Sequence, residues 1–486
     1  MKKTRILALL LCLVMLSAMF VGCTPIKNLG KPYEITWYNL SSLSKDNDKV
    51  FAKVSEYTKD KIGVTVKYMP LPGAEFKQKV PLLLASKEKI DMIFTASYQN
   101  FTTNVANGYY MELNDLIEKY GKELKKTVPE YFWNGTTVKG KIYAVPTTKE
   151  AAHHWVLTYQ EALAKKYNLD MSKITKIEDI EPMLKVIKEN EPDKYPLYYT
   201  AGGSLFNLLP YDSVIDMEVP GAFDVDTGVP TIVNQYDTDK AKQYFATVRD
   251  FYEKGYVRKD IDSVKELRDV ENTDKYFMGL AATLPYLEDV MKKSTKFPFN
   301  WIYSASYPIM SQGDLMGSMQ AIPASCENPE AVMKFINLLN TDKYLRNLVA
   351  YGIQDEHYVK TADNEYDLPE GIKSPNDNSY STYNFTIGNM FLTYIRKGTP
   401  QDLWAKYDEF TKSAKKSPGL GFVFDGANYT NQMAEIRNVY NEYMPSLLTG
   451  AVDPNVKLPQ ALAKFKLAGL DEVIKAAQAQ YDAMKK

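Results

Sequence analysis

Residues 33–39 read Tyr-Glu-Ile-Thr-Trp-Tyr-Asn, and residues 90–94 read Ile-Asp-Met-Ile-Phe. The first stretch alternates like a half-buried strand, and the second is a short, compact apolar strand. Between them, Val64, Val66 and Tyr68 mark another strand, and a helical pattern follows each of the three. Strands that alternate with helices in this way predict a parallel sheet covered by helices.

The same alternation continues along the chain. Further strands are expected at 142–145, 155–159 and 277–284, with helical patterns between and after them. Asn328-Pro329 is a typical helix start, because Asn caps the first turn and Pro fits its first position. A chain of 486 residues is long enough for two or three structural units.

Composition excludes some classes of function. Hydrophobic residues make up 45% of the chain, charged residues 24%, and the formal net charge is −1. These values are ordinary for a globular protein and give no electrostatic reason to expect a nucleic-acid partner. The 36 tyrosines outnumber the 3 histidines. Tyrosine combines an apolar face with a hydrogen-bonding tip, which suits polar, ring-shaped ligands, although most single tyrosines are expected to be structural.

The N-terminus has the pattern of a secretion signal. A basic start at residues 1–5 precedes an apolar run over 6–21, and Gly22 and Cys23 follow. The run is too short for a good membrane-spanning helix. A Cys directly after a small residue resembles the lipobox of bacterial lipoproteins, in which that Cys is lipidated and becomes the new N-terminus.

We therefore predict a signal peptide over 1–22, a lipid on Cys23 and a tether over 23–32. The alternative is an ordinary secretion signal followed by an incidental cysteine. Cys326 is the only other cysteine after the signal. Packing, and not disulfide bonds, is expected to hold the fold.

Two stretches of the sequence resemble metal sites only in part. His153 and His154 are adjacent, so in a strand they point to opposite faces and do not chelate one metal easily. Residues 224–228 begin like a calcium loop, but the Gly comes one position early and Gln235 stands where Glu is needed. We expect a turn there. No cofactor or metal is expected.

Several segments, in their order along the chain, resemble extracellular solute-binding proteins of family 1. They are residues 33–39, 90–94 with 108–116, 140–146, and 321–324 with 328–342. The tail from Gly421 to the last helix is similar to the C-terminal segment of the lipoprotein LipO group. Together these segments cover nearly all of the chain after the leader.

This resemblance implies an α/β, two-lobed periplasmic-binding-protein-like type II fold with an interlobe hinge and a cleft. Lobe one is expected over 33–150 plus 317–355. Lobe two is expected over 151–316 plus 356–486, including a C-terminal helical segment. Such lobes close about the hinge when a ligand contacts both of them.

The resemblance also implies a function. The protein is expected to capture a carbohydrate, an oligosaccharide in the first place, and to deliver it to the permease subunits of an ABC importer. It would be a monomer without enzymatic activity, held by its lipid on the extracytoplasmic face of the bacterial membrane. One alternative keeps this role for a peptide or another small polar solute, and another is a secreted carbohydrate-active enzyme.

Candidate ligand-binding residues follow strand ends and the first crossing between lobes, because ligands of open α/β sheets lie beyond the carboxyl ends of strands. Tyr and Trp rings would stack on the C–H face of a sugar, and polar groups would bind its hydroxyls. Trp37 has the alternative of a core strand residue, Glu150 that of a brace, and Trp301, with Tyr303 and Tyr307, that of a half-buried strand. The candidates are Trp37, Tyr38, Asn39, Ser97, Tyr98, Gln99, Glu150, His154, Trp155, Tyr286 and Trp301.

Overall fold

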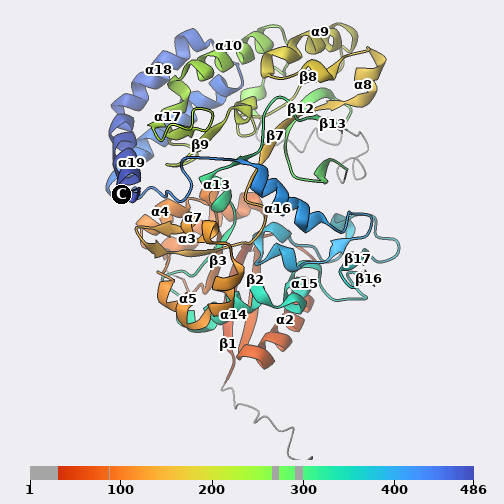
Figure 1. Ribbon diagram of the computed structural model, residues 1–486, viewed down its shortest axis with the longest axis vertical. Helices are drawn as coiled ribbons and strands as arrows, with labels where there is room; N and C mark the ends of the chain where they lie inside the picture. The colour runs from red at the N-terminus through yellow and green to blue at the C-terminus, as the bar shows by residue number, and fades with distance from the viewer. Residues whose placement is uncertain (1–30, 87, 265–272, 290–298, 486) are drawn as a thin grey trace, which may run out of the picture.

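The computed structural model of the chain describes residues 31–86, 88–264, 273–289 and 299–485. It has two lobes, each built on its own sheet, which lie one above the other in Figure 1. The expected two-lobed α/β architecture is confirmed. The expected signal peptide, Cys23 and most of the expected tether lie outside the described residues. Within them, no helix is long and apolar enough to cross a bilayer.

The first lobe contains a five-stranded sheet in the order β2-β1-β3-β15-β6. β1 is parallel to β2 and β3, whereas β15 is antiparallel to both of its neighbours. The strands predicted at the start of the chain are therefore present and parallel, and β15 is a later segment inserted beside them. The strands are β1 (Tyr33–Leu40), β2 (Val64–Leu71), β3 (Met92–Thr95), β6 (Ala144–Pro146) and β15 (Met319–Ala321).

Helices cover both faces of this sheet. On one face Trp37 packs at 6.1 Å from the ring of Phe51 in α2 (Asn47–Ile62) and at 5.8 Å from Phe335 in α14 (Pro329–Thr341). The helical pattern that follows the third predicted strand includes Leu113 to Leu124. It forms two helices there, α5 (Asn114–Tyr120) and α6 (Lys122–Thr127), because Gly121 ends the first. The opposite face is covered by α3 (Gly73–Ser86) and α4 (Phe101–Ala106).

The second lobe contains a four-stranded sheet in the order β13-β7-β12-β8. β7 is antiparallel to β12 and β13, and β12 is parallel to β8. A large apolar core packs against this sheet and reaches the helices α9 (Glu181–Asn190) and α10 (Asp239–Glu253). The strands are β7 (His154–Gln160), β8 (Tyr195–Leu197), β12 (Tyr276–Thr283) and β13 (Phe299–Ile302).

The C-terminal helices belong to the same core as this sheet. α17 (Thr430–Leu448), α18 (Pro454–Leu467) and α19 (Leu470–Met484) contribute buried side chains such as Ile436 and Val473 to it. They pack beside α10, as the blue and green helices of Figure 1 show. The C-terminal segment is therefore an integral part of the second lobe.

Residues 356–414, which we expected in the second lobe, pack on the first. Tyr380, Ile387 and Ala414 are buried in the core that contains Trp37. The segment includes a small sheet of β16 (Val359–Ala362), β17 (Glu365–Asp367) and β18 (Ile395–Arg396), followed by α16 (Leu403–Ser413). Its polar sequence gave no sign of this packing, because a few well-spaced apolar side chains make the contacts.

The chain passes between the lobes at three places. The first crossing lies between β6 and β7, and the second lies between β14 (Ile309–Met310) and β15. The third follows α16, where β19 (Lys415–Lys416) pairs with β14. The expected lobe bounds placed this third crossing near residue 355, and it lies instead after α16, because residues 356–414 pack on the first lobe. The three connections lie side by side and form the hinge.

Gly450 sets how closely the turn between α17 and α18 approaches α10. Its φ is +74°, and a Cβ atom there would lie 2.2 Å from the carbonyl oxygen of Val248. We expect Gly450→Ala to lower the free energy of unfolding by about 2–4 kcal/mol, because backbone strain and a backbone clash add. Denaturant unfolding measures this change.

Gly228 provides the matched control. It has a φ of +62° and no atom within 4 Å of a Cβ, so Gly228→Ala carries only the conformational cost of about 1–2 kcal/mol. Equal losses in the two variants would contradict close packing at Gly450.

Candidate functional site

A short 3₁₀ turn at the carboxyl end of β3 presents three of the candidate residues. This turn, η1 (Ser97–Gln99), is held where the amide of Ser97 donates to the carbonyl of Met316 at 2.8 Å. The side chain of Tyr98 is 39% exposed and packs against Phe94, and its partial burial raises the pKa of the phenol above the usual value. Ser97, Tyr98 and Gln99 therefore lie together at the edge of the first sheet that faces the second lobe.

Trp37 and Asn39 lie inside the first lobe and not on a ligand surface. Both are fully buried. The indole of Trp37 donates to Gln320 at 3.0 Å, and the amide of Asn39 donates to Tyr68 at 3.2 Å and Thr386 at 2.9 Å. These groups already have protein partners, so we exclude both residues from the candidate site. Tyr38 points to the opposite face and is half-buried.

Glu150 lies in the first crossing, where it contacts α16. It is 8% exposed, and its Oε1 accepts from the ammonium of Lys149 at 2.8 Å. Burial and the charge of Glu150 both raise the pKa of Tyr407 in α16. Oε2 of Glu150 is buried and has no hydrogen-bond partner among the described residues. Glu150 thus braces the crossing and keeps one acceptor free.

The second lobe contributes aromatic candidates near the start of β7 and the end of β12. The ring of buried His154 lies 5.8 Å from that of Tyr303, and burial lowers the pKa of the imidazole. Tyr303 is 44% exposed, and Trp301 is half-buried with its ring 6.5 Å from that of Tyr303. Trp155 is half-buried against the core. Tyr303 was not among the candidate residues predicted from the sequence, although its ring is the most exposed of this group.

Tyr286 contacts the other lobe. It has a positive φ of 64°, and its hydroxyl donates to Asp402, at the start of α16, at 3.3 Å. α16 packs with the first lobe, so this hydrogen bond connects the lobes beside the hinge. In the described state Tyr286 is an interlobe contact.

The hinge contains a buried glutamine, Gln312, that forms hydrogen bonds with three separate segments of the chain. Gln312, in α13 (Gln312–Leu315), is fully buried and donates to the carbonyl of Gly135 in the first lobe at 2.9 Å. Its side-chain Oε1 accepts from the backbone amide of Gly421, after the third crossing, at 2.8 Å. Its backbone amide donates to the carboxylate of Asp212, in the second lobe, at 3.1 Å. No sequence pattern identified this residue, because a single glutamine has no signature.

Titratable groups surround this amide. His153 in the first crossing contacts the carboxylate of Asp314 at 2.8 Å. Burial alone lowers the pKa of His153 and raises that of Asp314, but their mutual attraction outweighs it and shifts both pKa values the other way. Burial raises the pKa of Asp212 to about 6, against hydrogen bonds from Ser417 and Gln312. The hinge therefore holds buried charges.

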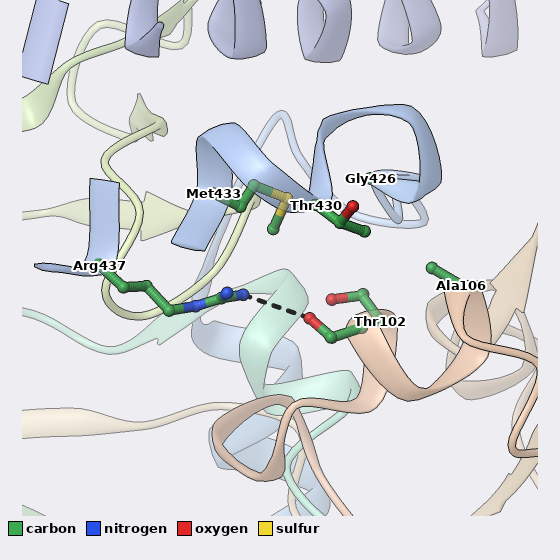
Figure 2. A pocket seen from close by; sticks show the side chains of 7 residues that line it. Thr102, Ala106, Gly426, Thr430, Met433 and Arg437 are labelled. Carbon is green, nitrogen blue, oxygen red and sulfur yellow. Dashed lines mark hydrogen bonds between the residues drawn. The ribbon is translucent and has the colours of Figure 1, made fainter. Parts of the chain in front are cut away.

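The lobes also face each other across a narrow pocket. Figure 2 shows Arg437 extending from α17 toward α4, with Thr430 and Met433 on its own side and Thr102 on the other. Arg437 donates to Asp216 at 2.8 Å and, across the pocket, to Thr103 at 3.3 Å. Arg437 therefore connects the C-terminal helices to the helix that follows Tyr98.

An ionic contact also links the lobes. Lys139, in the turn between β4 (Thr137–Val138) and β5 (Lys141–Ile142), pairs with Asp425. Gln480 of α19 holds Asp425 by donating to its carbonyl at 3.0 Å and accepting from its amide at 2.9 Å. The C-terminal segment thus contacts the first lobe through one ion pair and through the hydrogen bond from Arg437 to Thr103.

Two clusters of acidic residues resemble metal sites. Among the described residues, Asp46, Glu356 and His357 lie close enough to hold an ion. However, Nδ1 of His357 accepts from the amide of Ile353 at 3.0 Å, so Nε2 carries the proton and faces Asp46 at 3.2 Å. The lone pair that a metal needs is absent from Nε2, and Lys49 neutralises Glu356.

The calcium-like turn is neutralised in another way. The ammonium of Lys240 lies 2.9 Å from Asp224 and 2.8 Å from Asp226. This lysine supplies the positive charge that a cation would otherwise provide. The expected turn is present at these residues.

Residues 43–345 match the sequence model of the bacterial extracellular solute-binding proteins. The chain belongs to this family. Residues 418–486, which include the third crossing's end and the three C-terminal helices, match a domain of unknown function, DUF3502. A Streptococcus pneumoniae protein described as a carbohydrate ABC transporter substrate-binding protein is 27% identical over 453 residues, covering 92% of this chain and 90% of that protein.

Solved structures show the same fold. The N-glycan transport solute-binding protein NgtS of S. pneumoniae is 25% identical, with a TM-score of 0.80 over 93% of this chain and 98% of that one. Its complex with Man5GlcNAc gives a TM-score of 0.77 over the same fractions. A solute-binding protein of Bifidobacterium longum infantis, described as binding HMO, is 15% identical, with a TM-score of 0.67 over 94% of this chain and 100% of that one. The periplasmic-binding-protein-like fold is confirmed.

The buried carboxyl of Asp212 predicts a pH dependence of stability. Its pKa is raised in the folded state, so the unfolded chain releases its proton first and the stability from this group is lost as pH rises from about 4 to about 6. A rise from 3.8 to about 6 corresponds to about 3 kcal/mol. Denaturant unfolding at pH 4 and pH 7 measures this loss. The free energy of unfolding of the wild type is compared with that of Asp212→Asn at each pH.

The exposed Asp237→Asn is the control, in the same lobe. Relative to the wild type, Asp212→Asn should gain about 2.4 kcal/mol between these two pH values, because part of the loss has already occurred at pH 4, and Asp237→Asn should not. A difference between wild type and Asp212→Asn that stays constant with pH would contradict the raised pKa.

Proposed function

We propose that this protein captures an oligosaccharide between its lobes and presents it to the permease of an ABC importer. The observation that carries the proposal is the structural match to NgtS, which covers nearly the whole of both chains. The matched structure of NgtS contains bound Man5GlcNAc. The similar S. pneumoniae protein described as a carbohydrate transporter component supports the same class of solute. The protein would bind its solute and leave it unaltered.

The chemistry of the facing edges supports a sugar. Tyr98 on the first lobe and Tyr303 on the second expose aromatic faces, on which the C–H face of a pyranose ring packs well. Ser97 and Gln99 offer hydrogen-bonding groups beside Tyr98, and the free acceptor of Glu150 lies in the first crossing. A site with a few polar groups among aromatic rings is typical of small-molecule recognition.

We assign the ligand-binding role to the candidates that the structure leaves at the interlobe edges. Trp37 and Asn39 are omitted because their groups are buried and paired. Tyr303 is added because its ring is exposed beside His154. The proposed set is Tyr38, Ser97, Tyr98, Gln99, Glu150, His154, Trp155, Tyr286, Trp301 and Tyr303.

Closure would follow from contacts that bridge the lobes. A solute that touches both lobes stabilises the state in which they are close, since it binds that state more tightly. Arg437, Tyr286 and Lys139 make contacts between the lobes. We infer that these contacts lower the cost of closing when a solute enters.

A thermal-shift series tests the function. Man5GlcNAc, a fructan, an alginate oligosaccharide and a mixed peptide pool are added separately, and a bound solute raises the melting temperature by mass action. We expect the glycan to raise it and the peptides not to. Calorimetry should give one glycan per chain, and chromatography should recover the glycan uncleaved.

Tyr98→Ala should weaken glycan binding roughly tenfold, because a stacked ring contributes about 1–1.5 kcal/mol. Tyr195→Ala, at an exposed tyrosine on β8, is the control. A peptide-only response would favour the alternative cargo, and released sugar fragments would indicate an enzyme. Either result would overturn the proposal.

We also propose that Cys23 carries the membrane anchor after removal of residues 1–22. The basic start, the apolar run and the Gly-Cys junction support this processing. In a bacterial host, the wild type should incorporate labelled palmitate and sediment with membranes, whereas Cys23→Ala should do neither. Labelling of the variant would show that the lipid lies elsewhere.

A further inference from the structure

A loop on the first lobe exposes a pair of aromatic rings. The rings of Tyr383 and Phe385 lie 6.1 Å apart and nearly parallel, at 10°. Phe385 is 40% exposed, although it has no polar group to interact with water. Tyr383 packs against the cluster that contains Phe94 and Met316, the residues that support Tyr98 and Ser97. The pair therefore shares an apolar cluster with the residues that support the η1 turn.

Hydrogen bonds attach this loop to the edge that faces the second lobe. Ser318, in the second crossing, donates to the carbonyl of Phe385 at 2.7 Å. Gln320 donates to the carbonyl of Thr386 at 2.8 Å, and the amide of Met390 donates to the carbonyl of Thr148, in the first crossing, at 2.9 Å. The loop thus spans the end of the first sheet between two hinge crossings.

A buried arginine fixes the shape of the loop. Arg346, in α15 (Lys343–Tyr351), is 0% exposed, and burial lowers its pKa to about 10. Its guanidinium donates to the carbonyls of Asn384 at 2.9 Å and Asn389 at 3.1 Å. Among the residues that the structure describes, no carboxylate forms an ion pair with it.

The placement of Arg346 has a cost that needs a reason. A charge removed from water and not paired with an opposite charge is unfavourable, and Nη1 of Arg346 also lacks a hydrogen-bond partner among the described residues. Here the donors of Arg346 point at main-chain carbonyls on either side of Phe385. The fold therefore holds an apolar ring exposed in one fixed position, which is typical of a binding surface.

We propose that Phe385, backed by Tyr383, is a stacking platform for one sugar ring of the captured solute, and that Arg346 positions it. The inference rests on the proposed oligosaccharide function. A phenyl face suits the C–H face of a pyranose, and a preorganised ring avoids the entropy loss of ordering a loop on binding. The platform belongs to residues 356–414, outside the segments from which the candidate residues were chosen.

Variants of Phe385 test the platform with Man5GlcNAc as the probe. Calorimetry should show roughly ten- to fiftyfold weaker binding for Phe385→Ala and nearly unchanged binding for Phe385→Trp, which keeps an aromatic face. Tyr344→Ala is the matched control: Tyr344 is a 56% exposed ring on the same lobe, also beside a tyrosine, at 4.8 Å from Tyr57. It should bind like the wild type.

Two failures are distinguishable. If the wild type binds Man5GlcNAc and Phe385→Ala binds within twofold of it, the platform is wrong and the proposed function stands. If the wild type binds none of the oligosaccharides, the function and the platform fall together. Unfolding curves of Phe385→Ala that match the wild type verify that the fold is intact.

A double-mutant cycle tests the positioning role of Arg346. Arg346→Lys keeps the charge but not the fork that reaches both carbonyls, so it should weaken glycan binding several-fold in the wild-type background. In the Phe385→Ala background it should have almost no further effect, because it acts through that ring. Additive losses in affinity would show that Arg346 has only a general structural role.

Discussion

The buried residue Gln312 connects three segments that belong to different parts of the fold. It bonds Gly135 of the first lobe, Gly421 after the third crossing and, through its own backbone, Asp212 of the second lobe. An amide in this position has no water to replace a lost partner, so each bond that breaks leaves a costly unsatisfied group. Lobe movement must therefore occur around this point and not through it.

The proposed binding surface and the hinge lie close together. Ser318 and Thr148 lie in crossings, and both bond to the loop that carries Phe385. Arg437, which closes the pocket against α4, extends from the C-terminal helices that continue from the third crossing. A solute between the lobes would therefore contact surfaces whose supports are hinge elements, which is the arrangement that couples binding to closure.

Much of the fold could be predicted from the sequence, because period-two strands around Trp37 and Met92 and the capped helix after Asn328 are local patterns. The placement of 356–414 could not be predicted, because it depends on scattered buried residues such as Tyr380 and Ile387. The site divides in the same way. Strand-end position selected Ser97, Tyr98 and Gln99, which lie in a turn at the sheet edge, but it also selected Trp37 and Asn39, whose burial depends on helices far along the chain. Arg346 and Gln312 have no local pattern, since their partners are distant carbonyls.

The three crossings interleave the lobes along the sequence. The first core needs Trp37 near one end of the chain and Ala414 far toward the other, and the second core is completed only by Tyr481. A chain emerging from its N-terminus can therefore finish neither lobe until almost all of it is available, and contacts of such long range form slowly. For a family whose members work outside the cell, late completion leaves the chain without a stable native lobe while most of its length is still being made.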